Sequence, residues 1–151
     1  MKKSALALTI CMIVQSQLGF AAEKTATFAG GCFWCVEAAY QDEPGVIDAI
    51  SGFTGGTLLR PTYQGNHRGH YEAVQVTYDD AIISYEALTE IFWKNIDPFD
   101  NAGQFCDKGP SYRSAVFYDG PEQESVALAS KTAVAKRFPG QAIATELLAA
   151  S

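Results

Sequence analysis

The chain has 151 residues, 48% of them apolar, and a formal net charge of −6. This length and composition are sufficient for one globular domain with a hydrophobic core. Because the balance is acidic and the basic residues form no run longer than a pair, we expect no nucleic acid partner.

The first 21 residues have the pattern of a secretory signal peptide. Lys2 and Lys3 precede an apolar run over residues 5–14, and small residues at the end of the segment predict cleavage after Ala21. The run is shorter than the about 20 residues that span a bilayer, so export is favoured over a membrane anchor. We therefore expect a periplasmic or secreted protein without stable membrane insertion, whose formal charge falls from −6 to −8 when the two lysines are removed.

The mature domain, residues 22–151, begins with a short strand pattern at residues 25–29 and continues into helix-forming residues 36–40. The turn between them is Gly30-Gly31-Cys32-Phe33-Trp34-Cys35. Cys32 therefore lies at a predicted helix N-terminus, where free backbone N–H groups and the helix dipole favour the nucleophilic thiolate.

Residues 46–53 are predicted to form a strand that ends at Gly55-Gly56. A polar loop without apolar periodicity follows, over residues 57–70. Residues 72–78 then alternate as a strand does, with Glu72 at the beginning. One face of this strand carries Val74, Val76 and Tyr78.

The second half alternates between helix and strand. Ser84 caps a helix whose apolar positions are Leu88, Ile91, Phe92 and Trp93. An irregular stretch over residues 99–111 separates it from a strand at 112–118 and a helix at 123–138. This order predicts an α+β two-layer sandwich, a mixed sheet with helices packed on it, and favours it over a doubly wound sheet.

Several short segments follow one another in a characteristic order across roughly residues 27–123. They are Gly31-Cys32-Phe33-Trp34 with Glu37, Gly52-Phe53-Thr54-Gly55-Gly56, Pro61-Thr62-Tyr63, Gly69-His70-Tyr71-Glu72-Ala73-Val74, Phe92-Trp93, and Asp107 with Tyr112-Arg113-Ser114. The series resembles the A-type peptide methionine sulfoxide reductases. The resemblance implies a ferredoxin-like core and reduction of methionine S-sulfoxide, free or in proteins, as repair of oxidative damage.

The resemblance also implies roles for individual residues. Cys32 matches the nucleophile that takes the sulfoxide oxygen and becomes a sulfenic acid, and Glu72 matches the acid that supplies a proton. Tyr63 and Tyr112 match two hydroxyl donors to the sulfoxide oxygen. Phe33 and Trp34 match two rings that surround the methyl group of the substrate, and Asp107 matches an acid that orients the substrate.

The sulfenic acid needs a second thiol, and the mature chain keeps three cysteines: Cys32, Cys35 and Cys106. The CxxC spacing makes Cys35 the preferred resolving thiol, and Cys106 is the alternative because it adjoins Asp107. The resulting disulfide would be opened by an external dithiol such as a thioredoxin-like protein, with no metal or organic cofactor. We expect the enzyme to be a monomer.

Other interpretations of the same residues are open at this point. Cys32 and Cys35 could form a structural disulfide, or could bind zinc together with Cys106 and His70. A thioredoxin-like disulfide carrier would account for the CxxC motif but not for Glu72, Tyr63 or Tyr112. Relatives usually continue beyond the position of Ser151, so an inactive, C-terminally truncated relative with an exposed sheet edge after residues 143–148 is a further alternative.

Overall fold

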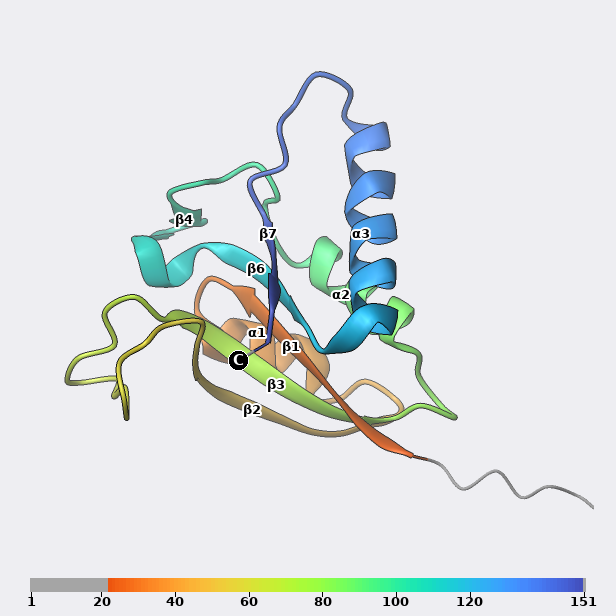
Figure 1. The fold of residues 1–151 in the computed structure, drawn as a ribbon, viewed down its shortest axis with the longest axis horizontal. Helices are drawn as coiled ribbons and strands as arrows, with labels where there is room; N and C mark the ends of the chain where they lie inside the picture. The colour runs from red at the N-terminus through yellow and green to blue at the C-terminus, as the bar shows by residue number, and fades with distance from the viewer. Residues whose placement is uncertain (1–21, 151) are drawn as a thin grey trace, which may run out of the picture.

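The computed structural model describes residues 22–150, so the predicted signal peptide lies outside the described residues. A mixed sheet of five strands forms the centre of the fold, in the order β2-β3-β1-β6-β7. In chain order these strands are β1 (Glu23–Gly30), β2 (Val46–Thr54), β3 (Tyr71–Asp79), β6 (Ser114–Tyr118) and β7 (Glu146–Ala149). Figure 1 shows β1 running through the middle of the sheet.

Strand β1 pairs antiparallel with both β3 and β6, and β2 pairs antiparallel with β3. Only β7, among the strands of residues 22–150, runs parallel to its neighbour, β6. The helix α3 (Gly120–Arg137) makes the crossover between these two strands. The predicted α+β fold is thus confirmed, and the doubly wound alternative is wrong because most strand pairs are antiparallel.

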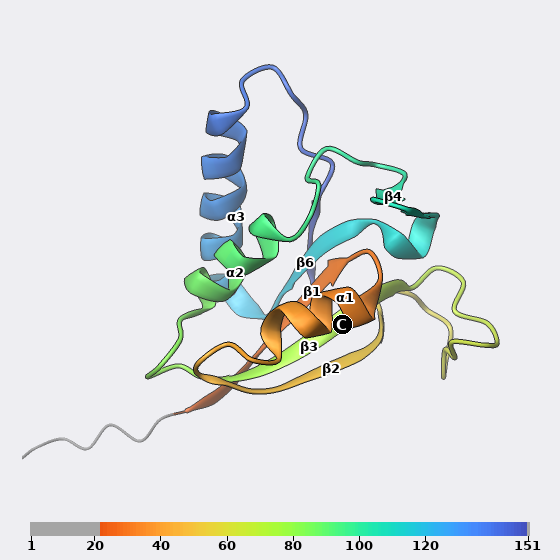
Figure 2. The same ribbon diagram turned by 180° about the vertical axis from the view of Figure 1, so that it is seen from behind.

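The helices pack on one face of the sheet. They are α1 (Phe33–Tyr40), α2 (Tyr85–Lys94) and α3. Their apolar residues join those of the strands in one core, in which the Phe28 ring of β1 stacks on Tyr40 of α1 and Phe92 of α2. Figure 2 shows α1 in front of β1 and β3, so the helix that begins at the cysteine motif is held directly against the central strands.

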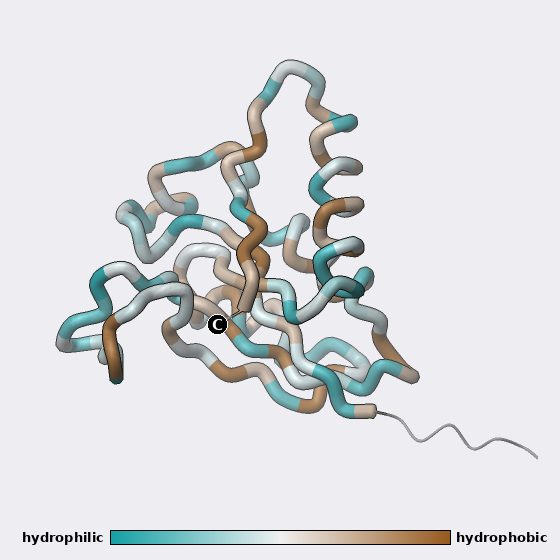
Figure 3. Tube along the Cα trace, in the orientation of Figure 1, coloured by the Kyte–Doolittle hydropathy of each residue, from teal (hydrophilic) through white to brown (hydrophobic). Residues whose placement is uncertain are grey.

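The opposite face of the sheet carries a second, smaller apolar cluster to which none of the three described helices contributes. Its buried members are Ala29, Tyr71, Ala73, Ala115 and Phe117. Leu148 of β7 packs against this cluster, while the adjacent Leu147 packs against the helix side; the brown colour of β7 in Figure 3 reflects these two leucines. Strand β7 forms one edge of the sheet.

Two local predictions need correction. Residues 99–111, expected to be irregular, contain a small hairpin of β4 (Gly103–Gln104) and β5 (Asp107–Lys108). Tyr112 was expected to begin a strand but ends the 3-10 helix η1 (Pro110–Tyr112), because Gly109 and Pro110 impose a turn before β6.

The predicted cap of α2 is confirmed, since Ser84 Oγ accepts a hydrogen bond from the Ala87 N–H. Within residues 22–150 no helix is both long and apolar enough to cross a membrane.

Candidate active site

Cys32 is the N-cap residue of α1, as predicted. Its backbone carbonyl accepts the N–H groups of Cys35 and Val36 at 3.0 and 3.2 Å, which starts the helix. The chain reaches this position through Gly31, whose φ of +91° suits glycine. A Cβ atom at Gly31 would lie only 2.7 Å from the Cβ of Gln104. The turn thus presents a half-buried, free thiol at the N-terminus of a helix.

The second thiol of the motif, Cys35, lies beside the first. The pKa of Cys35 is raised, chiefly by a hydrogen bond with the Cys32 side chain, then by partial burial and by the negative charges of Cys32 and Asp107. Both cysteines are free, and Cys35 is exposed. The two sulfur atoms are therefore placed to exchange with each other, and one of them is accessible from solvent.

Glu72 is buried at the beginning of β3, with only 2% of its surface exposed. Its Oε2 accepts a hydrogen bond from the Phe33 N–H at 3.2 Å, whereas Oε1 has no partner among the described residues. Burial raises the pKa of this carboxyl, an effect that the Phe33 N–H and His67 oppose and that the charge of Asp107 reinforces. Glu72 therefore holds its proton to a higher pH than an exposed glutamate.

Aromatic rings form a wall beside the Cys32 turn. The Phe33 ring centroid lies 5.1 Å from Trp34 and 5.8 Å from Tyr63, and Trp34 lies 5.1 Å from Tyr63. Phe53 of β2 supports the wall from behind, at 5.6 Å from Phe33. Phe33 is buried while Trp34 and Tyr63 are about half exposed, so the wall can receive a small apolar group from solvent.

Tyr112 completes the cluster. The pKa of its hydroxyl is raised, first by the negative charge of Glu72, then by burial and by Asp107, Tyr63 and Cys32. These contributions place the phenol among the other predicted residues, even though Tyr112 comes from η1 and not from a strand. Asp107, on β5, acts on the pKa values of Glu72, Cys35 and Tyr112 alike. The structure thus brings together thiols, acid, hydroxyls and rings.

Cys106, the alternative resolving thiol, lies in the turn between β4 and β5 and is exposed. The groups that shift the pKa of Cys35 include Cys32 and Asp107 but not Cys106. The positions of the side chains do not support the zinc alternative. The Nε2 of His70 lies 3.1 Å from the Leu58 carbonyl oxygen. Within residues 22–150 no three His, Cys, Asp or Glu side chains converge as metal ligands. The geometry favours the pair Cys32 and Cys35.

Three supporting residues were not predicted as part of the site. Glu37 accepts hydrogen bonds from the N–H and hydroxyl of Ser51 and so fastens α1 to β2. Gln104 is buried against Gly31 and bonds both the N–H and the carbonyl of Asp97, at 2.7 and 2.8 Å. His67 stacks on Phe53 at 4.8 Å. Of these three residues, only Glu37 could have been connected with the site from the sequence, because it lies in the cysteine motif.

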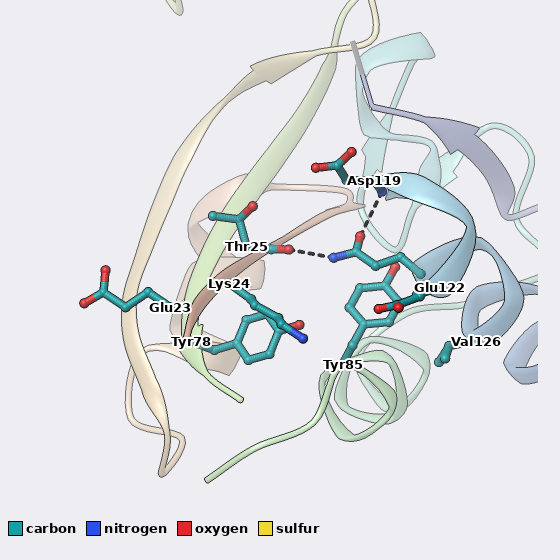
Figure 4. A pocket seen from close by; sticks show the side chains of 9 residues that line it. Glu23, Lys24, Thr25, Tyr78, Tyr85, Asp119, Glu122 and Val126 are labelled. Atoms are coloured by element: carbon teal, nitrogen blue, oxygen red, sulfur yellow. Dashed lines mark hydrogen bonds between the residues drawn. The ribbon is translucent and has the colours of Figure 1, made fainter. Parts of the chain in front are cut away.

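A cavity of about 450 Å³ lies at the opposite ends of β1 and β3 from the cysteines. The Gln123 side chain accepts a hydrogen bond from the Asp119 N–H and donates one to the Thr25 carbonyl. Figure 4 shows Thr25 and Asp119 at the margin of the cavity, with Tyr78 and Tyr85 below. Its lining includes no cysteine and none of the predicted site residues. It is therefore separate from the thiol cluster.

Comparison with known proteins matches a family model described as peptide methionine sulfoxide reductase over residues 24–151. The chain is 46% identical over 149 residues to peptide methionine sulfoxide reductase MsrA 2 of Caulobacter vibrioides, covering 97% of this chain and 76% of the relative. It is 47% identical over 114 residues to the MsrA of Listeria monocytogenes, covering 74% of this chain and 64% of that relative. The chain is thus shorter than both relatives.

Solved structures agree with the sequence comparison. Methionine sulfoxide reductase A of Corynebacterium diphtheriae superposes with a TM-score of 0.76 and 31% identity, over 88% of this chain and 68% of that one. Reduced Mxr1 from Saccharomyces cerevisiae gives a TM-score of 0.74 and 25% identity, over 85% of this chain and 77% of Mxr1. Mxr1 has also been solved in complex with Trx2, where it shares the fold at a TM-score of 0.62, 21% identity and the same coverage.

Proposed function

This chain belongs to the peptide methionine sulfoxide reductase family, and we propose that it reduces methionine S-sulfoxide in peptides and proteins through a sulfenic acid on Cys32. The predictions of the family, of the α+β fold and of methionine sulfoxide reduction as the family's activity are confirmed by the comparisons. The epimer preference and the roles of individual residues are parts of the proposal.

The first step transfers oxygen from substrate to enzyme. The methyl group of the sulfoxide lies against Phe33 and Trp34, and its oxygen faces the hydroxyls of Tyr63 and Tyr112. Glu72 gives its proton to that oxygen, which makes the sulfoxide sulfur electrophilic toward the Cys32 thiolate. The attack forms a bond between the two sulfur atoms, and this bond and the S–O bond of the substrate then break as the OH group passes to the Cys32 sulfur. Methionine leaves with its sulfur reduced by two electrons, and Cys32 becomes a sulfenic acid, oxidised by two electrons.

The second step discharges the sulfenic acid. The Cys35 thiol attacks the sulfur of Cys32, a disulfide forms, and the oxygen leaves as water. The side chain of Cys32 is the main cause of the raised pKa of Cys35, and this proximity supports the pairing. A dithiol reductant then opens the disulfide and becomes a disulfide itself, and the exposure of Cys35 gives such a partner access to one sulfur.

The observation that carries the proposal is the carboxyl of Glu72. A buried polar atom without a partner costs about 1–3 kcal/mol, and the Oε1 of Glu72 is such an atom among the described residues. With its pKa raised by burial, the group holds its proton to a higher pH than an exposed glutamate and can deliver that proton to a sulfoxide oxygen in the site. A structural disulfide would need no such acid.

The test is a single turnover by the purified, pre-reduced mature chain with each methionine sulfoxide epimer. We expect stoichiometric methionine from the S epimer alone and the loss of two thiols. Methionine formed with no loss of thiols would contradict the disulfide step. No methionine from a folded sample would contradict the reductase and favour the inactive relative. The thioredoxin-like carrier is already excluded as a family assignment by the comparisons.

The physiological setting is a further part of the proposal. A thioredoxin-like dithiol as reductant is supported by the exposed Cys35 and by the complex of Mxr1, a protein of the same fold, with Trx2. Export to the periplasm or medium is supported by the signal pattern in the first 21 residues. Cell fractionation with an antibody tests the location, and size-exclusion chromatography of the mature chain tests the proposed monomer.

A further inference from the structure

The loop of residues 57–70 contributes Tyr63 to the site although it contains no helix or strand. Its backbone is held by a few local hydrogen bonds, among them those from the Thr62 N–H to the Asn66 carbonyl at 3.2 Å and from the Gly65 N–H to the Thr62 carbonyl at 3.3 Å. These bonds close the loop on itself but do not join it to the sheet. Side chains must therefore set the position of Tyr63.

His67 makes that connection. Its Nδ1 lies 3.2 Å from the Thr62 carbonyl, and because a carbonyl oxygen only accepts, the contact is a hydrogen bond when Nδ1 carries the proton. The imidazole ring stacks on Phe53 of β2, with centroids 4.8 Å apart and planes within 15°. His67 thus ties the residue before Tyr63 to a strand of the main sheet.

The contacts form a closed circuit. From His67 the rings continue through Phe53 to Phe33, at 5.6 Å, and from Phe33 to Tyr63, at 5.8 Å. The peptide bond from Tyr63 back to Thr62 closes the circuit. Phe53 is also the register partner of Glu72 across the β2 and β3 pair. Each ring therefore has two neighbours in the circuit, and His67 is the one member whose side chain supplies both a ring stack and a hydrogen bond.

We propose that His67 is a positioning residue that holds the Tyr63 hydroxyl where the sulfoxide oxygen binds. The proposal deepens the proposed function and rests on it for the role of Tyr63. The position of the imidazole also accounts for its effect on the acid, since His67 is one of the groups that lower the pKa of Glu72 against burial.

Two variants separate the contacts of His67. His67→Phe keeps a ring on Phe53 and removes the Nδ1–H donor, and His67→Gln keeps a donor and removes the ring. Arg68→Gln, at the exposed neighbouring position, is the matched control. Each protein is assayed for kcat and KM with a peptide that contains methionine S-sulfoxide.

We expect both His67 variants to lower kcat by up to about a hundredfold, the order of magnitude for loss of one preorganised donor, with little change in KM. The double variant His67→Phe/Tyr63→Phe should be no slower than Tyr63→Phe alone, because both changes remove the same interaction. Independent, multiplicative losses in the double variant would overturn the proposal, as would a control that loses as much as His67→Phe.

A readout without turnover separates this proposal from the proposed function. In the wild-type protein the rings of Phe33 and Trp34 should shift the proton NMR signals of the Tyr63 ring. The His67 variants should move these signals toward the values of an unfolded peptide, while Arg68→Gln leaves them in place. If the signals move but wild type reduces neither epimer, the positioning role stands and the proposed function fails. If wild type is active and the signals do not move, the positioning role is wrong.

Discussion

The backbone N–H of Phe33 donates a hydrogen bond to the Oε2 of Glu72 at 3.2 Å. The donor is the first residue of α1 and the acceptor lies at the beginning of β3, 39 positions along the chain. This bond joins the residue after the nucleophile to the acid. It also leaves the second carboxyl oxygen, Oε1, free to carry a proton. One hydrogen bond therefore both orients Glu72 and determines which of its oxygens can donate the proton.

Replacement of Glu72 by glutamine should slow the first turnover by about 10²–10⁴-fold, the contribution of general acid catalysis. Since the reactive form is the protonated carboxyl, whose pKa is raised by burial, wild-type activity should fall as pH rises through that pKa. Glu72→Gln should lack this limb. Single-turnover rates across pH test it, with Glu90→Gln on the exposed face of α2 as control. Equal pH profiles in wild type and Glu72→Gln would count against Glu72 as the acid.

The same group should make stability depend on pH. Because the folded-state pKa of Glu72 lies above its ordinary value of 4.5, the folded protein binds this proton more tightly than the unfolded chain. Wild type should therefore lose free energy of unfolding relative to Glu72→Gln as pH rises from 4.5 through the raised pKa, and the difference should be constant above it. Urea unfolding of both proteins at several pH values measures the difference; an opposite slope would mean that the pKa is lowered.

Replacement of Cys35 by serine should spare the first turnover and stop recycling, because the sulfenic acid on Cys32 then has no adjacent thiol. Cys106→Ser is the matched control at an exposed cysteine and should recycle normally with a dithiol. The measurement is methionine formed per enzyme, in the first turnover and at steady state. If Cys35→Ser recycles normally and Cys106→Ser stops after one turnover, the resolving thiol is Cys106 and not Cys35.

Replacement of Gly31 by alanine should destabilise the fold and displace Cys32. Both Gly31 and Gly69 have positive φ, +91° and +84°, so alanine at either site costs about 1–2 kcal/mol of backbone strain. Only at Gly31 does the added Cβ meet another residue, Gln104, at 2.7 Å, whereas Gly69 has open space. Urea unfolding should therefore show a larger loss for Gly31→Ala than for Gly69→Ala. Equal losses would mean that Gln104 moves aside freely.

The features that could be predicted from the sequence are those that local pattern determines. The alternation of Val74, Val76 and Tyr78 indicated β3, and Ser84 marked the start of α2. The position of Cys32 at a helix start also followed from neighbouring residues. Such features depend on propensity and periodicity over a few residues, which can be recognised without knowledge of distant contacts.

Contacts between distant segments could not be predicted in the same way. The burial of Glu72 depends on the packing of α1 over β3, and the place of Gln104 depends on a hairpin of two-residue strands folding back onto Gly31. The 3-10 turn that holds Tyr112 is too short to show periodicity. The resemblance assigned roles to Glu72 and Tyr112, but only their tertiary neighbours explain how those roles are carried out.

The order of strands in the sheet has a consequence for how the protein opens. Strand β1 is the central strand of the five and lies farthest from both edges, which are β2 and β7, so amide exchange should be slow in β1 and fastest at the edges. Cys32 lies just beyond the end of this central strand, while Phe53 lies on an edge strand. Fluctuations of the native state should therefore loosen the ring that supports the substrate wall long before they release the nucleophile.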